Sequence, residues 1–159
     1  MRYIECPAEY NGKDLSLFLG GGISNCPDWQ SELVEKLKDT DLVLINPRRK
    51  IFPIDDSNAS TKQIEWEYPH LEKSKGVCFW FPAETLCPIT LFELGKQSVI
   101  GKPLFVGVHP DYQRKLDVEV QMKLQRPGLS VVYSLDDLAK QVSLWANRTK
   151  GLKPGVLGE

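Results

Sequence analysis

The chain carries GVCFWFPAETLCPITLFELGK at residues 76–96, and this stretch decides the fold. Residues 76–81 are almost all apolar, which is typical of a strand buried on both faces of a sheet. Pro88 suits the first turn of a helix, and Glu93 follows about one turn later. The apolar face of this helix, which we expect to pack on the sheet, is predicted to contain Ile89, Phe92 and Val99, with Leu91 and Leu94 beside them.

Glu93 is the first candidate functional residue. A helix that follows a buried parallel strand begins above the carboxyl end of that strand, where open α/β sheets bind their ligands. The helix dipole and the free backbone N–H groups of the first turn favour an ionised carboxylate. Glu93 is therefore a candidate nucleophile, and the alternative is a glutamate that only stabilises the first helical turn.

Length and composition indicate one globular domain. The 159 residues suffice for a continuous core, and 26% charged residues is an ordinary fraction. The net charge is −1 and the basic run is confined to residues 48–50, so we expect no binding to nucleic-acid polymers. We assign residues 1–149 to the domain and residues 150–159, which contain three glycines and a proline, to a C-terminal tail.

The sequence lacks the patterns typical of membrane spans, signal peptides and metal sites. No apolar run approaches the length of a membrane span, and the first residues show no signal-peptide pattern. We therefore expect a cytoplasmic protein without a membrane partner. The four cysteines form no CxxC pair and the two histidines lie far apart, so no metal site is predicted.

Strands and helices alternate along the rest of the chain. Helices are predicted from Ser24 or Asn25, over 61–74 with Pro69 as a kink or a break, and after the capping box that begins at Ser134. This alternation predicts a single flavodoxin-like or Rossmann-like α/β domain, with a five-stranded, mainly parallel sheet in the order 2-1-3-4-5 and helices on both faces. The five predicted strands are 16–19, 42–45, 76–81, 104–108 and 129–133. Residues 117–124 are mixed and give no assignment.

A glycine-rich loop, GGGISN at residues 20–25, follows the first of these strands and precedes a helix. Backbone N–H groups in such a loop can hold an anion or a sugar, so we assign Gly20, Gly21, Gly22 and Ser24 to substrate binding. A tight turn without a ligand is the alternative. The loop matches neither GxGxxG nor a Walker A motif, so it does not indicate a dinucleotide or a triphosphate.

Polar residues also follow the strand at 42–45. Asn46 is followed by Pro47, Arg48 and Arg49, and the two arginines can bind a phosphate or a carboxylate through paired hydrogen bonds. Solvated surface arginines are the alternative.

The helix predicted over 61–74 carries Gln63, Trp66 and Glu67. Glu67 shares one helix face with Ile64 and Leu71, which would direct it toward the sheet edge near Glu93. Trp66 by itself is also compatible with a position in the core.

These motifs resemble the nucleoside 2-deoxyribosyltransferase superfamily, and within it the branch called nucleoside 2-deoxyribosyltransferase-like. The resemblance runs from about Leu17 to Gln121. The family places its catalytic glutamate in an E-[LI]-G context after a central strand, where Glu93 stands here, and an acidic residue on the preceding helix, where Glu67 stands. The markers are Phe18-Leu19-Gly20-Gly21, Asn46-Pro47-Arg48-Arg49, Gln63-x-x-Trp66-Glu67 and Ile89-Thr90-Leu91-Phe92-Glu93-Leu94-Gly95.

The resemblance implies cleavage or transfer at the N-glycosidic bond of (deoxy)nucleosides or their 5′-monophosphates, without a metal or organic cofactor. Glu93 would attack C1′, and Glu67 would assist the base or the acceptor, which is water in a hydrolase and a second base in a transferase. The glycine-rich loop would hold the sugar, and Arg48 or Arg49 would bind a 5′-phosphate. Asn46, Gln63 and Trp66 are further candidate substrate contacts, and a homo-oligomer is expected because family members commonly complete the site from a neighbouring subunit.

Two other functions remain open. TIR-like NAD glycohydrolases also use a catalytic glutamate in a flavodoxin-like fold, close to a tryptophan, so the stretch from Trp66 to Glu72 is a possible match that NAD turnover would reveal. A catalytically silent nucleotide-sensing domain would be stabilised by nucleotide without releasing base.

Overall fold

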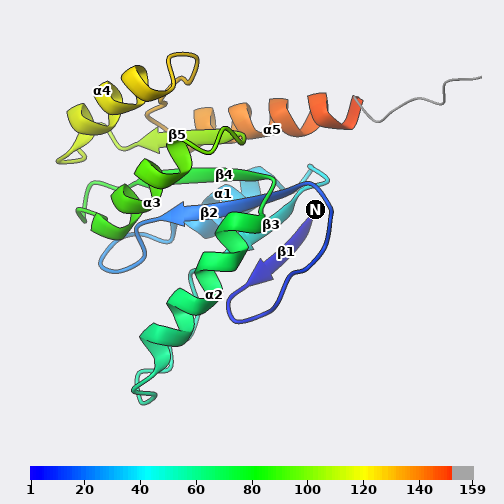
Figure 1. Ribbon diagram of the computed structural model, residues 1–159, viewed down its shortest axis with the longest axis vertical. Coiled ribbons are helices and arrows are strands. Elements are labelled where there is room, and N and C mark those ends of the chain that lie inside the picture. The colour runs from blue at the N-terminus through cyan, green and yellow to red at the C-terminus, as the bar shows by residue number, and fades with distance from the viewer. Residues whose placement is uncertain (152–159) are drawn as a thin grey trace, which may run out of the picture.

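A parallel sheet of five strands forms the centre of the computed structural model, which describes residues 1–151 (Figure 1). The strand order is β1-β3-β2-β4-β5 and every pairing is parallel, which confirms the predicted α/β class. In chain order the elements are β1 (Arg2–Glu5), β2 (Ser16–Gly21), α1 (Trp29–Lys36), β3 (Val43–Asn46), α2 (Ala59–Lys73), β4 (Gly76–Phe81), α3 (Pro88–Ser98), β5 (Leu104–Val108), α4 (Lys115–Gln125) and α5 (Leu135–Gly151).

The two edges of the sheet differ from the prediction. The N-terminal strand β1 was not predicted, and it extends the sheet beyond β3. The strand predicted at 129–133 is reduced to one bridge between Gly107 and Val132, because Ser134 begins the cap of α5 directly afterwards. The order of β3, β2, β4 and β5 agrees with the prediction. Helix α5 crosses the predicted boundary at residue 150, and the remainder of the predicted tail, 152–159, lies outside the described residues.

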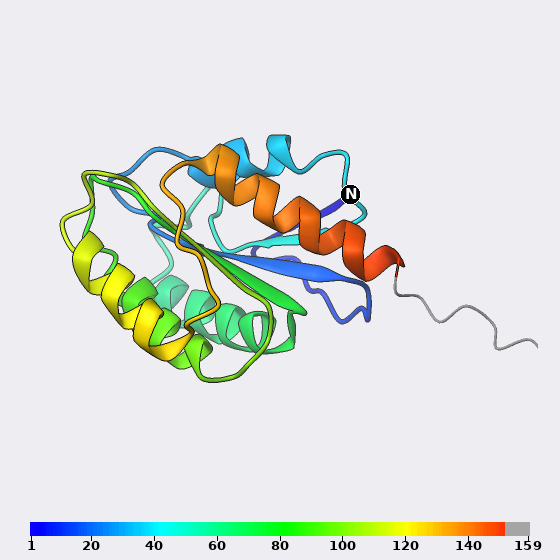
Figure 2. The ribbon, with the colours of Figure 1, turned by 90° about the horizontal axis from the view of Figure 1, so that it is seen from above.

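Helices cover both faces of the sheet, as Figure 2 shows from above: α1 and α5 lie on one face, and α2, α3 and α4 on the other. Alternating side chains of the central strands fill the two interfaces, since successive residues of a strand point to opposite faces. Phe18 of β2 packs in the core on the side of α2 and α3, whereas Leu17 and Leu19 pack on the side of α1 and α5. This burial on both faces accounts for the continuous apolar runs.

Helices α1 and α2 each differ from the prediction in one respect. Helix α1 begins after Asp28, whose Oδ1 accepts a hydrogen bond from Ser31 N at 3.1 Å, so Asp28 is the N-cap and not Ser24 or Asn25. Asn25 instead has a left-handed backbone, with φ of 57°. Helix α2 is one continuous segment although it contains Pro69, so the proline does not divide it.

Helix α3 turns a different face to the sheet from the one predicted. Leu94 is 3% exposed, and Thr90, Gln97 and Ser98 are buried with it. Ile89, Phe92 and Val99, the residues expected to pack on the sheet, are exposed, with Phe92 at 74%. The most apolar face of the helix therefore faces outward, and a more polar one packs inward.

Residues 117–124 belong to a helix, α4, which buries Val118 and Met122 one turn apart. None of the helices within residues 1–151 has the length and apolar character needed to span a membrane.

Candidate active site

A cavity of about 280 Å³ lies at the carboxyl ends of the neighbouring central strands β2 and β4. The chain leaves these two strands toward opposite edges of the sheet, which is where open α/β sheets form ligand crevices. The glycine-rich loop, the start of α3 and one side of α2 form the walls. The lining residues are Phe18, Gly20, Gly21, Gly22, Ile23, Ser24, Pro47, Ile64, Glu67, Thr85, Cys87, Pro88, Ile89, Thr90 and Glu93.

Two carboxylates, one from each helix, reach this cavity. Glu93 comes from α3 and Glu67 from α2, and both are half-buried. Burial, followed by the negative charge of Glu67, raises the pKa of Glu93 from its ordinary value of 4.5 to about 7, and Lys96 opposes this effect. The raised pKa runs against the expectation that the helix dipole keeps Glu93 fully ionised, and its causes are burial and the charge of Glu67.

Glu67 is charged more easily than its burial alone would allow. Burial raises its pKa, while a hydrogen bond from Gln63 and the positive charge of Arg49 lower it. Gln63 Nε2 donates to Glu67 Oε1 at 2.6 Å and to the carbonyl of Pro47 at 2.7 Å. The Cys6 thiol donates to Gln63 Oε1 at 3.2 Å, and Arg49 Nε donates to Cys6 Sγ at 3.1 Å. A directed chain of donors thus ends on the carboxylate.

Gln63 and Arg49 therefore act on Glu67 but do not line the cavity themselves. The part played by Cys6 was not predicted. Its only sequence signal is a lone cysteine that is separated from Gln63 by 57 positions.

The glycine-rich loop passes too close to its neighbours for side chains. A Cβ on Gly21 would lie 2.5 Å from the ring of Trp29, and one on Gly22 would lie 2.8 Å from Pro82 and 3.0 Å from Cys87 Sγ. Trp29 Nε1 also donates to the Gly22 carbonyl at 2.8 Å. The tight backbone is thus explained by packing, and the loop also forms a wall of the cavity together with Ser24.

Arg48, Asn46 and Trp66 do not line the cavity. Arg48 donates to the carbonyls of Pro27 at 2.8 Å and Cys26 at 3.2 Å, so its guanidinium holds the loop before α1. Asn46 is buried and donates to the Tyr3 hydroxyl at 2.8 Å.

Trp66 is buried in the core, where it stacks on His70 and donates to the Ala8 carbonyl at 3.0 Å. Trp66, Asn46 and Arg48 thus make contacts that hold the fold together and lie outside the cavity lining, and substrate contacts from them stay a prediction.

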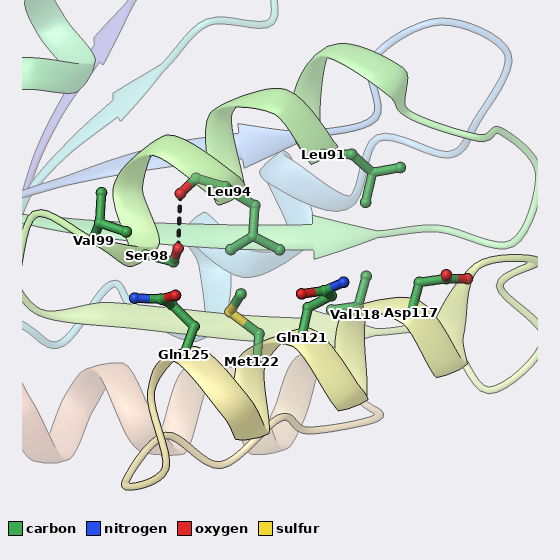
Figure 3. Close-up of a pocket in the computed structure, with 10 residues that line it drawn as sticks. Leu91, Leu94, Ser98, Val99, Asp117, Val118, Gln121, Met122 and Gln125 are labelled. Carbon is green, nitrogen blue, oxygen red and sulfur yellow. Dashed lines mark hydrogen bonds between the residues drawn. The ribbon is translucent and has the colours of Figure 1, made fainter.

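Two other hollows lack the carboxylate pair. Figure 3 shows a groove of about 270 Å³ between α3 and α4, where Leu94 faces Val118 and Met122, and Gln121 and Gln125 lie along α4. A hollow of about 760 Å³ lies at the amino ends of the strands and contains none of the predicted site residues. Aspartates also line the larger hollow, so neither size nor acidic residues alone select the site; the cavity is selected because it contains Glu93 and Glu67 at the carboxyl ends of the central strands.

The arrangement is suited to chemistry at a carbon that becomes positively charged. The charge of Glu67 raises the pKa of Glu93, and burial raises the pKa of both half-buried carboxylates. A pair of this kind can hold one proton near neutral pH, so one member can act as an acid while the other is a nucleophile. The residues that line the cavity within the described chain include no lysine, arginine or histidine.

Comparison with known proteins identifies one family. The model of the family described as nucleoside 2-deoxyribosyltransferase like matches residues 14–112, which contain both carboxylates and the glycine-rich loop. Comparison with curated proteins gives no match.

Proposed function

Because the chain belongs to the nucleoside 2-deoxyribosyltransferase-like family, we propose that it cleaves or transfers the N-glycosidic bond of nucleosides through Glu93. The observation that carries the proposal is the pair formed by Glu93 and Glu67 in one cavity at the carboxyl ends of β2 and β4. This site needs no metal or organic cofactor.

The reaction starts with attack of Glu93 on C1′ of the sugar. The bond from C1′ to the base nitrogen breaks, and its electron pair leaves with the base while a bond forms between C1′ and a Glu93 oxygen. Glu67 gives its proton to the departing base, so the reactive form has Glu93 ionised and Glu67 protonated. Gln63 and Arg49 favour the charged form of Glu67, and the charge of Glu67 raises the pKa of Glu93, so this reactive form is the less populated arrangement of the proton. Water or a second base then attacks C1′, the bond from C1′ to the Glu93 oxygen breaks with its electron pair going to Glu93, and the acceptor's proton passes to the Glu67 carboxylate.

The charges around the cavity favour a nucleoside over a 5′-monophosphate. A phosphate would enter a cavity that contains two carboxylates and, among residues 1–151, no lining lysine or arginine, and the guanidinium of Arg48 is engaged by backbone carbonyls. A neutral sugar avoids this repulsion. We therefore propose the unphosphorylated nucleoside as the substrate.

We also propose that the protein forms a homo-oligomer around this site. Ile64 and Tyr68 of α2, and Ile89 and Phe92 of α3, are all exposed. Ile64 and Ile89 also line the cavity, so a second copy that covered them would close its rim. Light scattering coupled to size-exclusion chromatography tests this, and a Phe92→Asp variant is expected to be monomeric. A monomeric wild-type protein would contradict it.

The experiment that tests the activity is a chromatographic assay for free base. Wild type is incubated with ribo- and deoxyribonucleosides and their 5′-monophosphates, with and without an acceptor base. We expect base release that Glu93→Ala reduces by roughly 10³-fold or more. Glu84→Ala is the matched control, because Glu84 is exposed on the loop before α3 and does not line the cavity.

Each result has a defined meaning. Full activity of Glu93→Ala would exclude Glu93 as the nucleophile. A requirement for acceptor base identifies a transferase, and its absence a hydrolase. Thermal stabilisation by a nucleotide without base release would indicate the sensing domain instead, and NAD turnover would indicate the TIR-like reaction.

A further inference from the structure

Thr90 is a buried polar residue on the inward face of α3. It is 5% exposed and lines the cavity with Glu93, which follows it by three positions on the same helix. Among the residues that the structure describes, its hydroxyl has no hydrogen-bond partner. Buried polar groups are nearly always hydrogen-bonded, so an unpaired hydroxyl at such a position calls for a physical reason.

The usual partner of a helical threonine is missing for a structural reason. A threonine hydroxyl in a helix normally donates to the carbonyl four residues earlier, which here belongs to Leu86. Cys87, the N-cap of α3, has a left-handed backbone with φ of 49°, so Leu86 lies before the helix, outside its regular geometry. The Tyr112 hydroxyl donates to the Leu86 carbonyl at 2.7 Å instead.

The hydroxyl of Thr90 is nevertheless not sealed inside the protein. In the described part of the chain, the fully shielded side-chain nitrogen or oxygen atom without a partner is Gln97 Oε1. The Thr90 oxygen, which also lacks a partner, is therefore not fully shielded, and Thr90 is one of the residues that line the cavity. A valine would fill this space with nearly the same shape and would carry no polar group to desolvate.

We propose that the Thr90 hydroxyl is a substrate contact that hydrogen-bonds a hydroxyl of the sugar. The inference rests on the proposed function for the identity of the ligand. Glu93 must lie beside C1′, and side chains three positions apart on a helix are neighbours, about 5–6 Å apart at Cβ. A sugar ring spans that distance, so the group that reaches Thr90 is a ring hydroxyl near C1′.

The proposal is tested by two substitutions with opposite expected effects. Thr90→Val removes the unpaired hydroxyl, so the melting temperature is expected to rise by roughly 2–5 °C. The same substitution leaves the sugar hydroxyl without a partner, so nucleoside binding is expected to weaken by roughly 5- to 50-fold. Thr90→Ser keeps the hydroxyl and loses a methyl group, so we expect lower stability with binding preserved.

Binding is measured by calorimetric titration with adenosine, 2′-deoxyadenosine, cytidine and 2′-deoxycytidine. Each Thr90 variant is compared in a Glu93→Gln background, which prevents turnover during the titration. Thr149→Val serves as the matched control, because Thr149 is a helical threonine whose hydroxyl already donates to the carbonyl of Trp145 at 2.9 Å. That control is expected to leave nucleoside binding unchanged and to give no gain in melting temperature.

The outcomes separate this proposal from the activity itself. A less stable Thr90→Val protein would mean that the hydroxyl has a structural partner, and equal binding by the more stable protein would mean that it touches no ligand. Either result overturns the assignment of Thr90 while base release by wild type still supports the activity. If wild type neither releases base nor binds a nucleoside, the proposed function and the sugar contact both fall.

Discussion

Glu93 occupies a position where its charge is costly to the folded protein. Its side chain is half-buried beside a second carboxylate, and the nearest compensating charge, Lys96, is also paired with Glu72 Oε1 at 3.0 Å. A residue chosen only for stability at this position would be uncharged. This cost supports the proposed catalytic role of Glu93, because carboxylates whose pKa is shifted by burial and a neighbouring charge cluster at functional sites.

This cost predicts a pH-dependent stability gain for Glu93→Gln. The pKa of Glu93 is about 7 in the folded protein and near its ordinary value of 4.5 in the unfolded chain, so the unfolded state ionises first. The penalty on folding is therefore absent below about pH 4.5, grows as the pH rises, and is complete above pH 7. We expect the variant to be more stable by roughly 1–3 kcal/mol at pH 8 and about equal to wild type at pH 4.5.

Urea denaturation at the two pH values measures the difference. Glu65→Gln is the control, because Glu65 is exposed on α2 and lies outside the cavity. A gain of the same size at both pH values would show that ionisation of Glu93 is not its source.

The hydrogen bond from Gln63 lowers the pKa of Glu67, so replacing Gln63 gives a second prediction. Gln63→Leu removes the donor to Glu67 while the burial of Glu67 stays, so the pKa of Glu67 is expected to rise further. Carbon-13 NMR titration of labelled glutamate side chains measures this change. Gln121→Leu, on the surface of α4, should leave the titration of Glu67 as it is in wild type. An unchanged Glu67 titration in Gln63→Leu would contradict the assigned role.

At the scale of elements, helix α3 buries a more polar face against the sheet and exposes a more apolar one. Its inward face contains Thr90, Leu94 and Gln97, and its outward face contains Ile89 and Phe92. Its buried polar residues have separate partners: Thr90 lines the cavity, and Gln97 Nε2 donates to Glu72 Oε1 at 2.9 Å, while the large apolar residues stay exposed. Those residues are then available to a second copy.

This orientation predicts unequal effects of two alanine substitutions. Leu94→Ala removes a buried side chain from the core and is expected to cost roughly 2–5 kcal/mol of unfolding free energy. Phe92→Ala at low protein concentration is expected to change it by less than about 0.5 kcal/mol. Chemical denaturation of both variants tests the pair, and a larger loss for Phe92→Ala under those conditions would show that the side chain is covered within one subunit.

The predictable part of the fold came from strands buried on both faces. Their apolar runs predict β2, β3, β4 and β5, whereas the strand predicted at 129–133 forms only one bridge. Parallel topology then brings the residues that follow β2 and β4 to one rim. The faces of α3 and α4 did not follow from apolar spacing, because Thr90 and Gln97 are polar and buried. The hydrogen bonds from Cys6 to Gln63 and from Gln63 to Glu67 could not be predicted in full, because Cys6 and Gln63 are far apart in the sequence and meet only in the folded chain.

At the scale of the whole molecule, the sheet sets the distance between two helices and thereby the protonation of the site. Helix α2 leads into β4 and α3 leaves it, so each helix contributes one carboxylate to the same cavity. The two residues therefore titrate as a pair, and the apparent pKa values belong to the pair.

Activity is accordingly expected to follow a bell-shaped pH profile. The pair must hold one proton for the base and keep one carboxylate ionised for attack, so kcat/KM should fall above about pH 7, where the last proton is lost. It should also fall at low pH, where both carboxylates are protonated. In Glu67→Gln the alkaline fall is expected to disappear, leaving lower activity that rises to a plateau. A wild-type rate that keeps rising to pH 9 would contradict this account.

The N-terminal strand β1 has a consequence for handling the protein. It covers the outer edge of β3, with backbone hydrogen bonds from Arg2 N to the Leu42 carbonyl at 2.9 Å and from Cys6 N to the Asn46 carbonyl at 3.0 Å. Trimming the first six residues would leave the backbone donors and acceptors of β3 unpaired, beside the apolar side chains of 43–45. An open strand edge of that kind recruits strands from other molecules, so a shortened protein is expected to precipitate during purification.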